Sequence, residues 1–247
     1  MVRAESAEGV ARIALDRPDK KNAFTAEMYR QLGAALASAD ADAGVRAVLL
    51  HGTRDCFSAG NDLADFLKPR APGEEPATSA LFRALPGMKK PVVAAVAGPA
   101  IGIGCTLLLH CDLVFAAENA RFQLPFVPLG IVPEFGSTLL LPLLAGYQRA
   151  AELLLLGEPF TAAQARDAGI VNAVVPVAEV LELAERKARA LAALPAESLR
   201  LTKALLKGTQ RGALETRIAE ETRIFAERLN SAEAKAAIKA FLEKRKG

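Results

Sequence analysis

Two glycine-rich turns constrain this chain most strongly, because each runs from an apolar strand-like segment into a helix start. The first turn covers residues 57–63, with the sequence Phe-Ser-Ala-Gly-Asn-Asp-Leu, and follows the apolar run 47–50. The second covers residues 97–104 and follows the apolar run 91–96. Helix starts present unpaired backbone N–H groups and the positive end of the helix dipole. Two such donors directed at one point predict an oxyanion hole, which stabilises an enolate or a tetrahedral anion.

Charge and cysteine content exclude several classes of protein. The 247 residues carry a net charge of +3, from 31 basic and 28 acidic residues, with no basic stripe. This balance argues against a nucleic-acid partner and against a membrane partner. The three cysteines, Cys56, Cys105 and Cys111, form no Cys-x-x-Cys pair, and residues 1–9 lack the apolar core of a secretory signal. We therefore expect a cytoplasmic protein with no disulfide scaffold and no metal site.

One uncharged stretch, residues 91–109, has the length of a membrane span. Its centre, however, contains Gly98, Pro99, Gly102 and Gly104, which would interrupt a lipid-facing helix. The segment is therefore predicted to form a buried strand, a turn and a buried helix over residues 105–110.

The order of the elements indicates an α/β fold followed by helices. Strands are predicted over residues 9–15, 45–50, 91–96, 112–117, 120–124 and 170–175. Thr25 is predicted to cap a helix, Ser137 to open another that Pro142 interrupts, and Thr161 with Gln164 to form a capping box. From residue 177 onward the pattern is helical only, with breaks near Pro195, Gly208 and Asn230. These amphipathic helices need a surface to pack on.

Short motifs along nearly the whole chain carry a family resemblance. They are Arg17-Pro18 with Asn22-Ala23, the two turns with Cys105, Cys111-Asp112, and the segments 129–133, 168–172 and 239–245. In this order they resemble the crotonase, or enoyl-CoA hydratase/isomerase, superfamily. The resemblance implies a crotonase-like spiral of ββα units over residues 1–194 and a helical trimerisation region over 195–247. It also implies an acyl-CoA thioester as substrate, no separate cofactor, and a homotrimer or a hexamer built as a dimer of trimers.

The resemblance also implies the binding site. By position, the oxyanion donors are the backbone N–H groups of Asn61 and Ile103, where the family usually has glycine at the second position. The residues implied in CoA binding are Lys20, Lys21, Ala23, Ala59, Gly60, Asp62, Leu63 and Gly102, with Phe241 and Lys244 from the C-terminal helix. The acyl pocket is expected to include Phe66, Thr106, Phe126 and Phe135, and the acyl tunnel Leu63, Leu67, Leu81 and Phe82.

The reaction depends on which acids are present. Hydratases of this family use two glutamates to activate water, and the corresponding positions here hold Thr106 and Phe126, neither of which is an acid. Glu134 lies instead in the apolar sequence Val-Pro-Glu-Phe-Gly, where Δ3-Δ2 enoyl-CoA isomerases have a catalytic glutamate. An isomerase needs only one base, which removes a proton at C2 and returns it at C4. An apolar surrounding would raise the Glu134 pKa toward the working range.

Other interpretations remain open for the same residues. Glu134 could be a helix-start acid that complements the dipole, and Asp62 and Asp65 are interpreted as helix caps. Asp112 is expected to be structural, and His51 and His110 to be core histidines with satisfied nitrogens. The alternatives to an isomerase are another acyl-CoA reaction of this fold, hydratase-like or a lyase, with an acid from the loop 68–79. A further alternative is a non-catalytic relative acting in assembly or RNA binding, which the near-neutral charge disfavours.

Overall fold

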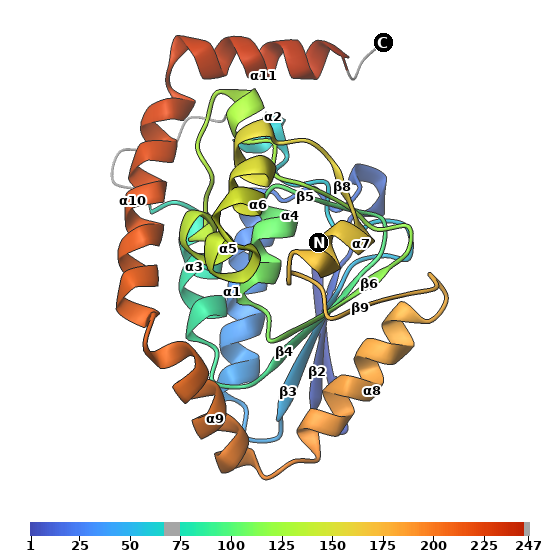
Figure 1. Cartoon of the computed structure of the whole chain (residues 1–247). Helices are drawn as coiled ribbons and strands as arrows, with labels where there is room; N and C mark the ends of the chain where they lie inside the picture. Colours follow the sequence, from blue (N-terminus) through green and yellow to red (C-terminus); the bar gives the residue numbers. More distant parts are fainter. Residues whose placement is uncertain (67–74, 245–247) are drawn as a thin grey trace.

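A mostly parallel six-stranded sheet forms the centre of the molecule (Figure 1). The computed structural model describes residues 1–66 and 75–244. The strand order is β1-β2-β3-β4-β6-β9, and only β1 pairs antiparallel, with β2. The strand bounds are β1 Val2–Ala7, β2 Val10–Leu15, β3 Ala47–His51, β4 Val92–Val96, β6 Leu113–Ala117 and β9 Ala173–Val175.

Strand β1 was not predicted from the sequence. Its residues are almost all exposed, so it has no apolar alternation that would mark it as a strand. Pairing with β2 through a tight turn at Glu8 and Gly9, which have φ of 51° and 77°, holds it in place. Two successive left-handed residues are the geometry of a type I′ hairpin, so turn chemistry rather than burial defines this edge strand.

A second, three-stranded sheet contains β5 (Pro99–Ile101), β7 (Arg121–Gln123) and β8 (Phe160–Thr161). The chain alternates between the two sheets, because β4 is followed by β5 and β6 by β7. Each such pair leads into a helical turn, α4 (Ile103–Thr106) after β5 and η3 (Val127–Leu129) after β7. This repetition is the spiral of ββα units that the family resemblance implied.

Helices cover both faces of the large sheet. On one face, α1 (Ala26–Ala41) packs with α3 (Thr78–Gly87) and shares the main core with Ile13, Val48 and Leu50. On the other face, α8 (Val180–Ala192) packs on Leu49, Val93 and Phe115. Burial on both faces explains the continuous apolar runs of the central strands.

The uncharged stretch 91–109 contains the predicted buried strand and a buried helical segment, but the short strand β5 lies where only a turn was predicted, and the helical segment begins at Ile103 rather than at residue 105. It forms β4, β5, α4 and the start of the 3-10 helix η2 (Leu107–His110), all within the core except for partly buried positions such as Leu109. In the described part of the chain, no helix is both long enough and apolar enough to cross a membrane.

Two of the three predicted helix starts are confirmed. Met28 N donates to Thr25 Oγ1 at the start of α1, and the Thr161–Gln164 capping box opens α7 (Ala162–Asp167). The predictions for α5 (Ser137–Ala145) were wrong, because its N-cap is Gly136 and Pro142 lies inside an uninterrupted helix. Ser137 is the first helical residue, and its hydroxyl has no partner.

Several short elements complete the chain between the second sheet and the C-terminal helices. Helix α6 (Tyr147–Ala151) continues into a π-helical turn, η4 (Glu152–Leu156), which ends at left-handed Gly157. The C-terminal helices are α9 (Ala196–Gly208), α10 (Arg211–Leu229) and α11 (Ala232–Lys244).

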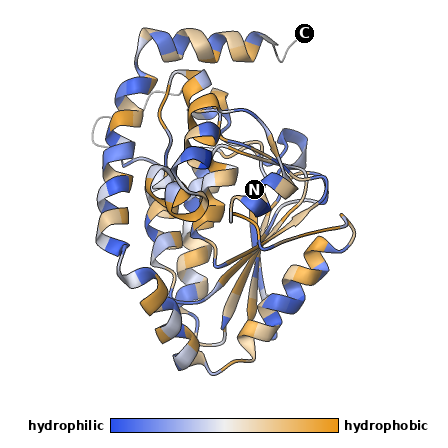
Figure 2. Ribbon diagram, viewed as in Figure 1, coloured by the Kyte–Doolittle hydropathy of each residue, from blue (hydrophilic) through white to orange (hydrophobic). Residues whose placement is uncertain are grey.

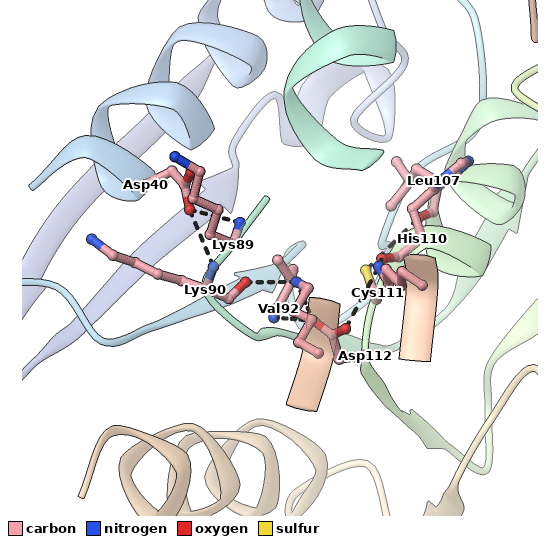
Figure 3. Close-up of polar contacts among 10 residues, drawn as sticks. Asp40, Lys89, Lys90, Val92, Leu107, His110, Cys111 and Asp112 are labelled. Carbon is pink, nitrogen blue, oxygen red and sulfur yellow. Dashed lines mark hydrogen bonds and ion pairs between the residues drawn. The ribbon is translucent and has the colours of Figure 1, made fainter. Parts of the chain in front are cut away.

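Helix α9 is held on the core of its own chain by two lysines. The buried Lys203 Nζ donates to Lys90 O and to Asp112 Oδ2, both at 2.7 Å. Asp112 also accepts from Val92 N at 2.7 Å, which agrees with the structural role predicted for it (Figure 3). One turn further along, Lys207 Nζ donates to His110 O at 2.8 Å. The helical region therefore packs against the sheet domain of the same chain, close to residues that lead into the site described next.

Candidate active site

The two glycine-rich turns lie side by side and are joined through their backbones. Ser58 N donates to Pro99 O, and Ile101 N donates to Ser58 O, both at 2.9 Å, so Ser58 and Ala100 form a parallel bridge. The approach is so close that a Cβ atom on Gly104 would lie 2.8 Å from the Ser58 Cβ. The predicted convergence of the two turns is therefore present in the fold.

Each turn contains a backbone N–H at its helix start that has no acceptor in the described part of the chain. Across residues 1–66 and 75–244, no protein acceptor is found for the N–H of Asn61 or of Ile103. Asn61 precedes the short helix α2 (Leu63–Phe66), and Ile103 opens α4 behind Gly102, whose φ is 53°. The Ile103 side chain is fully buried in the main core. Both N–H groups are thus available to a ligand, as an oxyanion hole requires.

Glu134 is the buried acid of this region. The residue is only 4% exposed, and its Oε1 has no hydrogen-bond partner among residues 1–66 and 75–244. Burial, and secondarily the charge of Glu221, raises the pKa of Glu134 to about 8. Buried polar atoms are almost always paired in proteins, so an unpaired carboxylate oxygen indicates a place where a ligand atom belongs.

An aromatic stack lies against the residue that follows Glu134. The Phe135 ring stacks between Phe82, at 4.1 Å between ring centroids, and His110, at 3.9 Å. His110 Nε2 lies 2.8 Å from Phe135 O, and because a carbonyl can only accept, this nitrogen carries the proton. Burial lowers the His110 pKa to about 3, so the ring is neutral. His110 is therefore a core histidine with a satisfied nitrogen, as predicted.

Tyr29 is a residue of the site that the sequence did not indicate. It is buried on α1, and its hydroxyl donates to Asn61 Oδ1 at 2.6 Å. Burial, and secondarily the Glu134 charge, raises the Tyr29 pKa well above its usual value. Tyr29 thus connects the first turn electrostatically with Glu134. In the sequence it is adjacent to the apolar positions of an amphipathic helix, and nothing distinguishes it from a core residue.

The two segments predicted to bind CoA also lie together. Ala59 N donates to Lys21 O at 2.9 Å, and Phe24 N donates to Gly60 O at 2.7 Å. Lys20 and Lys21 are exposed beside this pairing, where they could reach anionic phosphates. The structure therefore places Lys20, Lys21 and Ala23 next to Ala59, Gly60 and Asp62.

Asp62 and Asp65 hold this region together. Arg17 Nη1 donates to Asp62 Oδ2 at 2.8 Å and to Ala23 O at 3.0 Å. Asp65 Oδ2 accepts from Ala26 N, the first residue of α1, at 2.7 Å. The interpretation of Asp65 as a helix cap is confirmed, although the helix it caps is α1 rather than its own.

The remaining predicted residues are distributed as follows. Thr106 and Phe126 are buried, and Thr106 Oγ1 has no partner. Leu81 is fully buried, whereas Phe82 lines a cavity of about 610 Å³ between α3, α9 and α10. Phe241 lies on α11, which contacts η3 and α10, and is 38% exposed. The side chains of Phe66 and Lys244 and the loop positions 67–74, including Leu67, lie outside the described residues.

Comparison with known proteins identifies the family. The sequence profile of the enoyl-CoA hydratase/isomerase family matches residues 5–247. The chain belongs to the enoyl-CoA hydratase/isomerase family. A solved enoyl-CoA hydratase/isomerase from Pseudoalteromonas atlantica is 38% identical, superposes with a TM-score of 0.95, and covers 98% of this chain and 97% of its own. The crotonase fold is therefore shown, and this member of the family is an acyl-CoA enzyme.

Curated relatives of this family member differ in their reactions. It is 36% identical to the 1,2-epoxyphenylacetyl-CoA isomerase of Escherichia coli, covering 96% of this chain and 94% of the relative. It is also 36% identical to the 2,3-dehydroadipyl-CoA hydratase of the same organism, over 94% and 92% of the two chains. Human enoyl-CoA delta isomerase 2 is 35% identical, over 97% of this chain and 62% of the human protein. Identity at this level establishes the family and leaves the reaction to the residues of the site.

Replacing Tyr29 with phenylalanine tests the connection between α1 and the first turn. The change removes the hydrogen bond to the partly buried Asn61 amide, so we expect a loss of about 0.5–1.5 kcal/mol in the free energy of unfolding. We also expect a lower kcat, because the turn that carries the Asn61 N–H becomes less rigid. Chemical denaturation and acyl-CoA turnover measure the two effects. Equal stability and turnover of Tyr29→Phe and wild type would contradict the assignment.

Proposed function

We propose that this protein is an enoyl-CoA isomerase that converts 3-enoyl-CoA to 2-enoyl-CoA, with Glu134 as the single acid/base. The observation that carries the proposal is the buried Glu134 carboxylate, which has an oxygen without a partner among the described residues and lies close in sequence to the aromatic stack. The positions of the two hydratase glutamates hold Thr106 and Phe126, which cannot act as a base near neutral pH.

The proposed reaction proceeds through a dienolate. The substrate thioester oxygen accepts hydrogen bonds from the N–H groups of Asn61 and Ile103. Glu134 removes a proton from C2, and the electrons of that C–H bond form a C1–C2 double bond while the negative charge moves to the oxygen. In the second half, the oxygen electrons re-form the C1 carbonyl and the electrons of the C1–C2 double bond shift to form the C2–C3 double bond. The C3–C4 double bond breaks, and its electrons take the proton back from Glu134 as the new C4–H bond. Atoms and charge balance without a cofactor, and the CoA thioester is the substrate.

The raised pKa of Glu134 suits this role. A carboxylate of ordinary pKa is a weak base toward a carbon acid, whereas one with a pKa of about 8 holds the proton more strongly and still releases it near neutral pH. Burial supplies most of this shift, because the apolar surroundings disfavour the charged form.

Other properties of the proposed enzyme follow from the same site. Lys20 and Lys21 would contact the CoA phosphates, and Phe241 and Lys244 of α11 would contribute from the C-terminal end. Phe66, Thr106, Phe126 and Phe135 would line the acyl pocket. We place the enzyme in the cytoplasm on the basis of its three free cysteines, two of which are buried.

Replacing Glu134 with glutamine tests the proposal. Conversion of 3-hexenoyl-CoA to its 2-enoyl isomer should fall by about 10²–10⁴-fold, the usual contribution of a general acid/base. In the wild type, kcat/KM should rise with pH through a pKa of about 8, because only the ionised carboxylate accepts the proton. Absorbance of the conjugated thioester follows both experiments.

Glu158→Gln, on an exposed glutamate, serves as the matched control and should retain full activity. Equal isomerase activity in Glu134→Gln and wild type would show that the catalytic assignment is wrong. If neither protein isomerises the substrate but both hydrate crotonyl-CoA, the chain is a hydratase-like enzyme with an acid from elsewhere.

We further propose that the chain assembles as a homotrimer or as a hexamer of two trimers. Large apolar side chains are exposed in two regions of the described chain, on α9 and along α5 to η4. The ribbon is coloured hydrophobic at several positions in both regions (Figure 2). The exposed side chains are Leu201, Leu205 and Leu206 on α9, and Leu143, Leu144, Tyr147, Leu155 and Leu156 along α5 to η4. Clusters of exposed apolar residues mark contact surfaces between proteins.

Light scattering tests the assembly directly. The wild type should have three or six times the 26.1 kDa mass of the chain. The double substitution Leu205→Lys and Leu206→Lys places charges on the most exposed leucines of α9 and should lower the mass, whereas Lys235→Glu on α11 should not. A single-chain mass for the wild type would contradict the proposal.

A further inference from the structure

The segment of residues 134–136 has an unusual backbone. Phe135 has a φ of 61° and Gly136 a φ of 73°, so two successive residues lie in the left-handed region. For a bulky aromatic residue this conformation is unfavourable, and it persists only where surrounding contacts fix it. The contacts that hold this segment therefore determine where the Glu134 carboxylate lies.

One set of contacts comes from Glu221 on α10. Gly136 N donates to Glu221 Oε2 at 2.5 Å, and Thr138 N donates to Glu221 Oε1 at 3.0 Å. The Thr138 hydroxyl donates to the same Oε1 at 2.5 Å. Glu221 is itself only 4% exposed. It thus satisfies the free N–H groups at the start of α5, which Ser137 had been expected to cap.

The opposite side of the segment is held by His110, whose Nε2–H donates to Phe135 O. The backbone carbonyl of His110 in turn accepts from Lys207 on α9. Glu221 of α10 therefore accepts from the N–H that follows Phe135, and His110 of η2 donates to the Phe135 carbonyl. Helix α9 supports His110 in turn through Lys207. This arrangement accounts for the left-handed Phe135.

We propose that Glu221 is a positioning residue for Glu134, through which helix α10 fixes the catalytic carboxylate of its own chain. The inference rests on the proposed role of Glu134 as the base. It gives the C-terminal helices a part in catalysis in addition to any part in assembly, because without α10 the start of α5 loses its cap.

Charge adds a second effect of the same residue. Glu221 and Glu134 are both buried carboxylates, and the charge of Glu221 contributes to the raised pKa of Glu134. The groups facing Glu134 from other elements, Tyr29 and His110, are neutral near pH 7, and Arg217 faces Glu221. Neutralising Glu221 therefore removes the one negative charge that acts on Glu134, and its pKa should fall.

The substitution Glu221→Gln tests the proposal, with Glu227→Gln as the matched control on the exposed side of α10. We expect kcat for 3-hexenoyl-CoA to fall by on the order of 10–100-fold, since misplacing a catalytic group by about 1 Å can cost that much. The acid limb of the pH profile should move to lower pH. Hydrogen exchange of the first-turn amides of α5 should accelerate, while Glu227→Gln matches the wild type in all three measurements.

The variant Glu221→Asp separates the effect of the negative charge from the effect of side-chain length. It also provides a test if the Glu221→Gln protein does not fold. The aspartate keeps the charge but shortens the side chain, so kcat should fall while the acid limb stays near its wild-type position. Unchanged kcat in both variants, or a folded Glu221→Gln whose acid limb does not move, would overturn the proposal. If Glu134→Gln is fully active, the proposed function fails. If Glu134→Gln is inactive and Glu221→Gln is normal, only the role of Glu221 fails.

Discussion

The backbone pairing between the two glycine-rich turns is the contact on which the site depends. Ser58 exchanges hydrogen bonds with the second turn on both sides of Ala100, and Gly104 permits the close approach. Because each turn ends a parallel strand of the same sheet, the pairing places two helix starts together. The N–H of Ile103 is free because a first-turn residue has no partner within its own helix, and the N–H of Asn61, two residues before α2, likewise has no acceptor among the described residues.

A second constraint comes from burying an acid in this apolar region. Glu134 has no cation or hydrogen-bond donor at Oε1, so its ionisation is disfavoured and its pKa rises to about 8. Such an arrangement costs stability, and proteins retain it where the chemistry requires it. The left-handed backbone of Phe135 and the burial of the Glu221 carboxylate are two further unfavourable features of the same segment. Helices α9 and α10 therefore stabilise a segment that the sheet domain alone leaves without a cap.

Much of this could be predicted from the sequence, for identifiable reasons. The two turns, the central strands and Glu134 carry local signals, namely glycine spacing, continuous apolar runs and an acid between apolar residues. Glu221 and Tyr29 carry none, because their roles arise from contacts 85 and 32 residues away along the chain. Serine is a residue type favoured at helix N-caps, but at the start of α5 the Glu221 carboxylate of α10 accepts the hydrogen bonds from the backbone N–H groups instead. Strand β1 escaped prediction because exposed edge strands lack an apolar pattern.

Isomerisation of 3-hexenoyl-CoA in D₂O, with mass analysis of the product, tests the central claim most directly. If Glu134 is a single buried base that carries the C2 proton to C4, part of the product should retain the substrate hydrogen and contain less than one deuterium per turnover. The Glu134→Gln protein should form no such product. Incorporation of a full deuterium at every turnover, or product formation by the Glu134→Gln protein at the wild-type rate, would contradict a single shielded base.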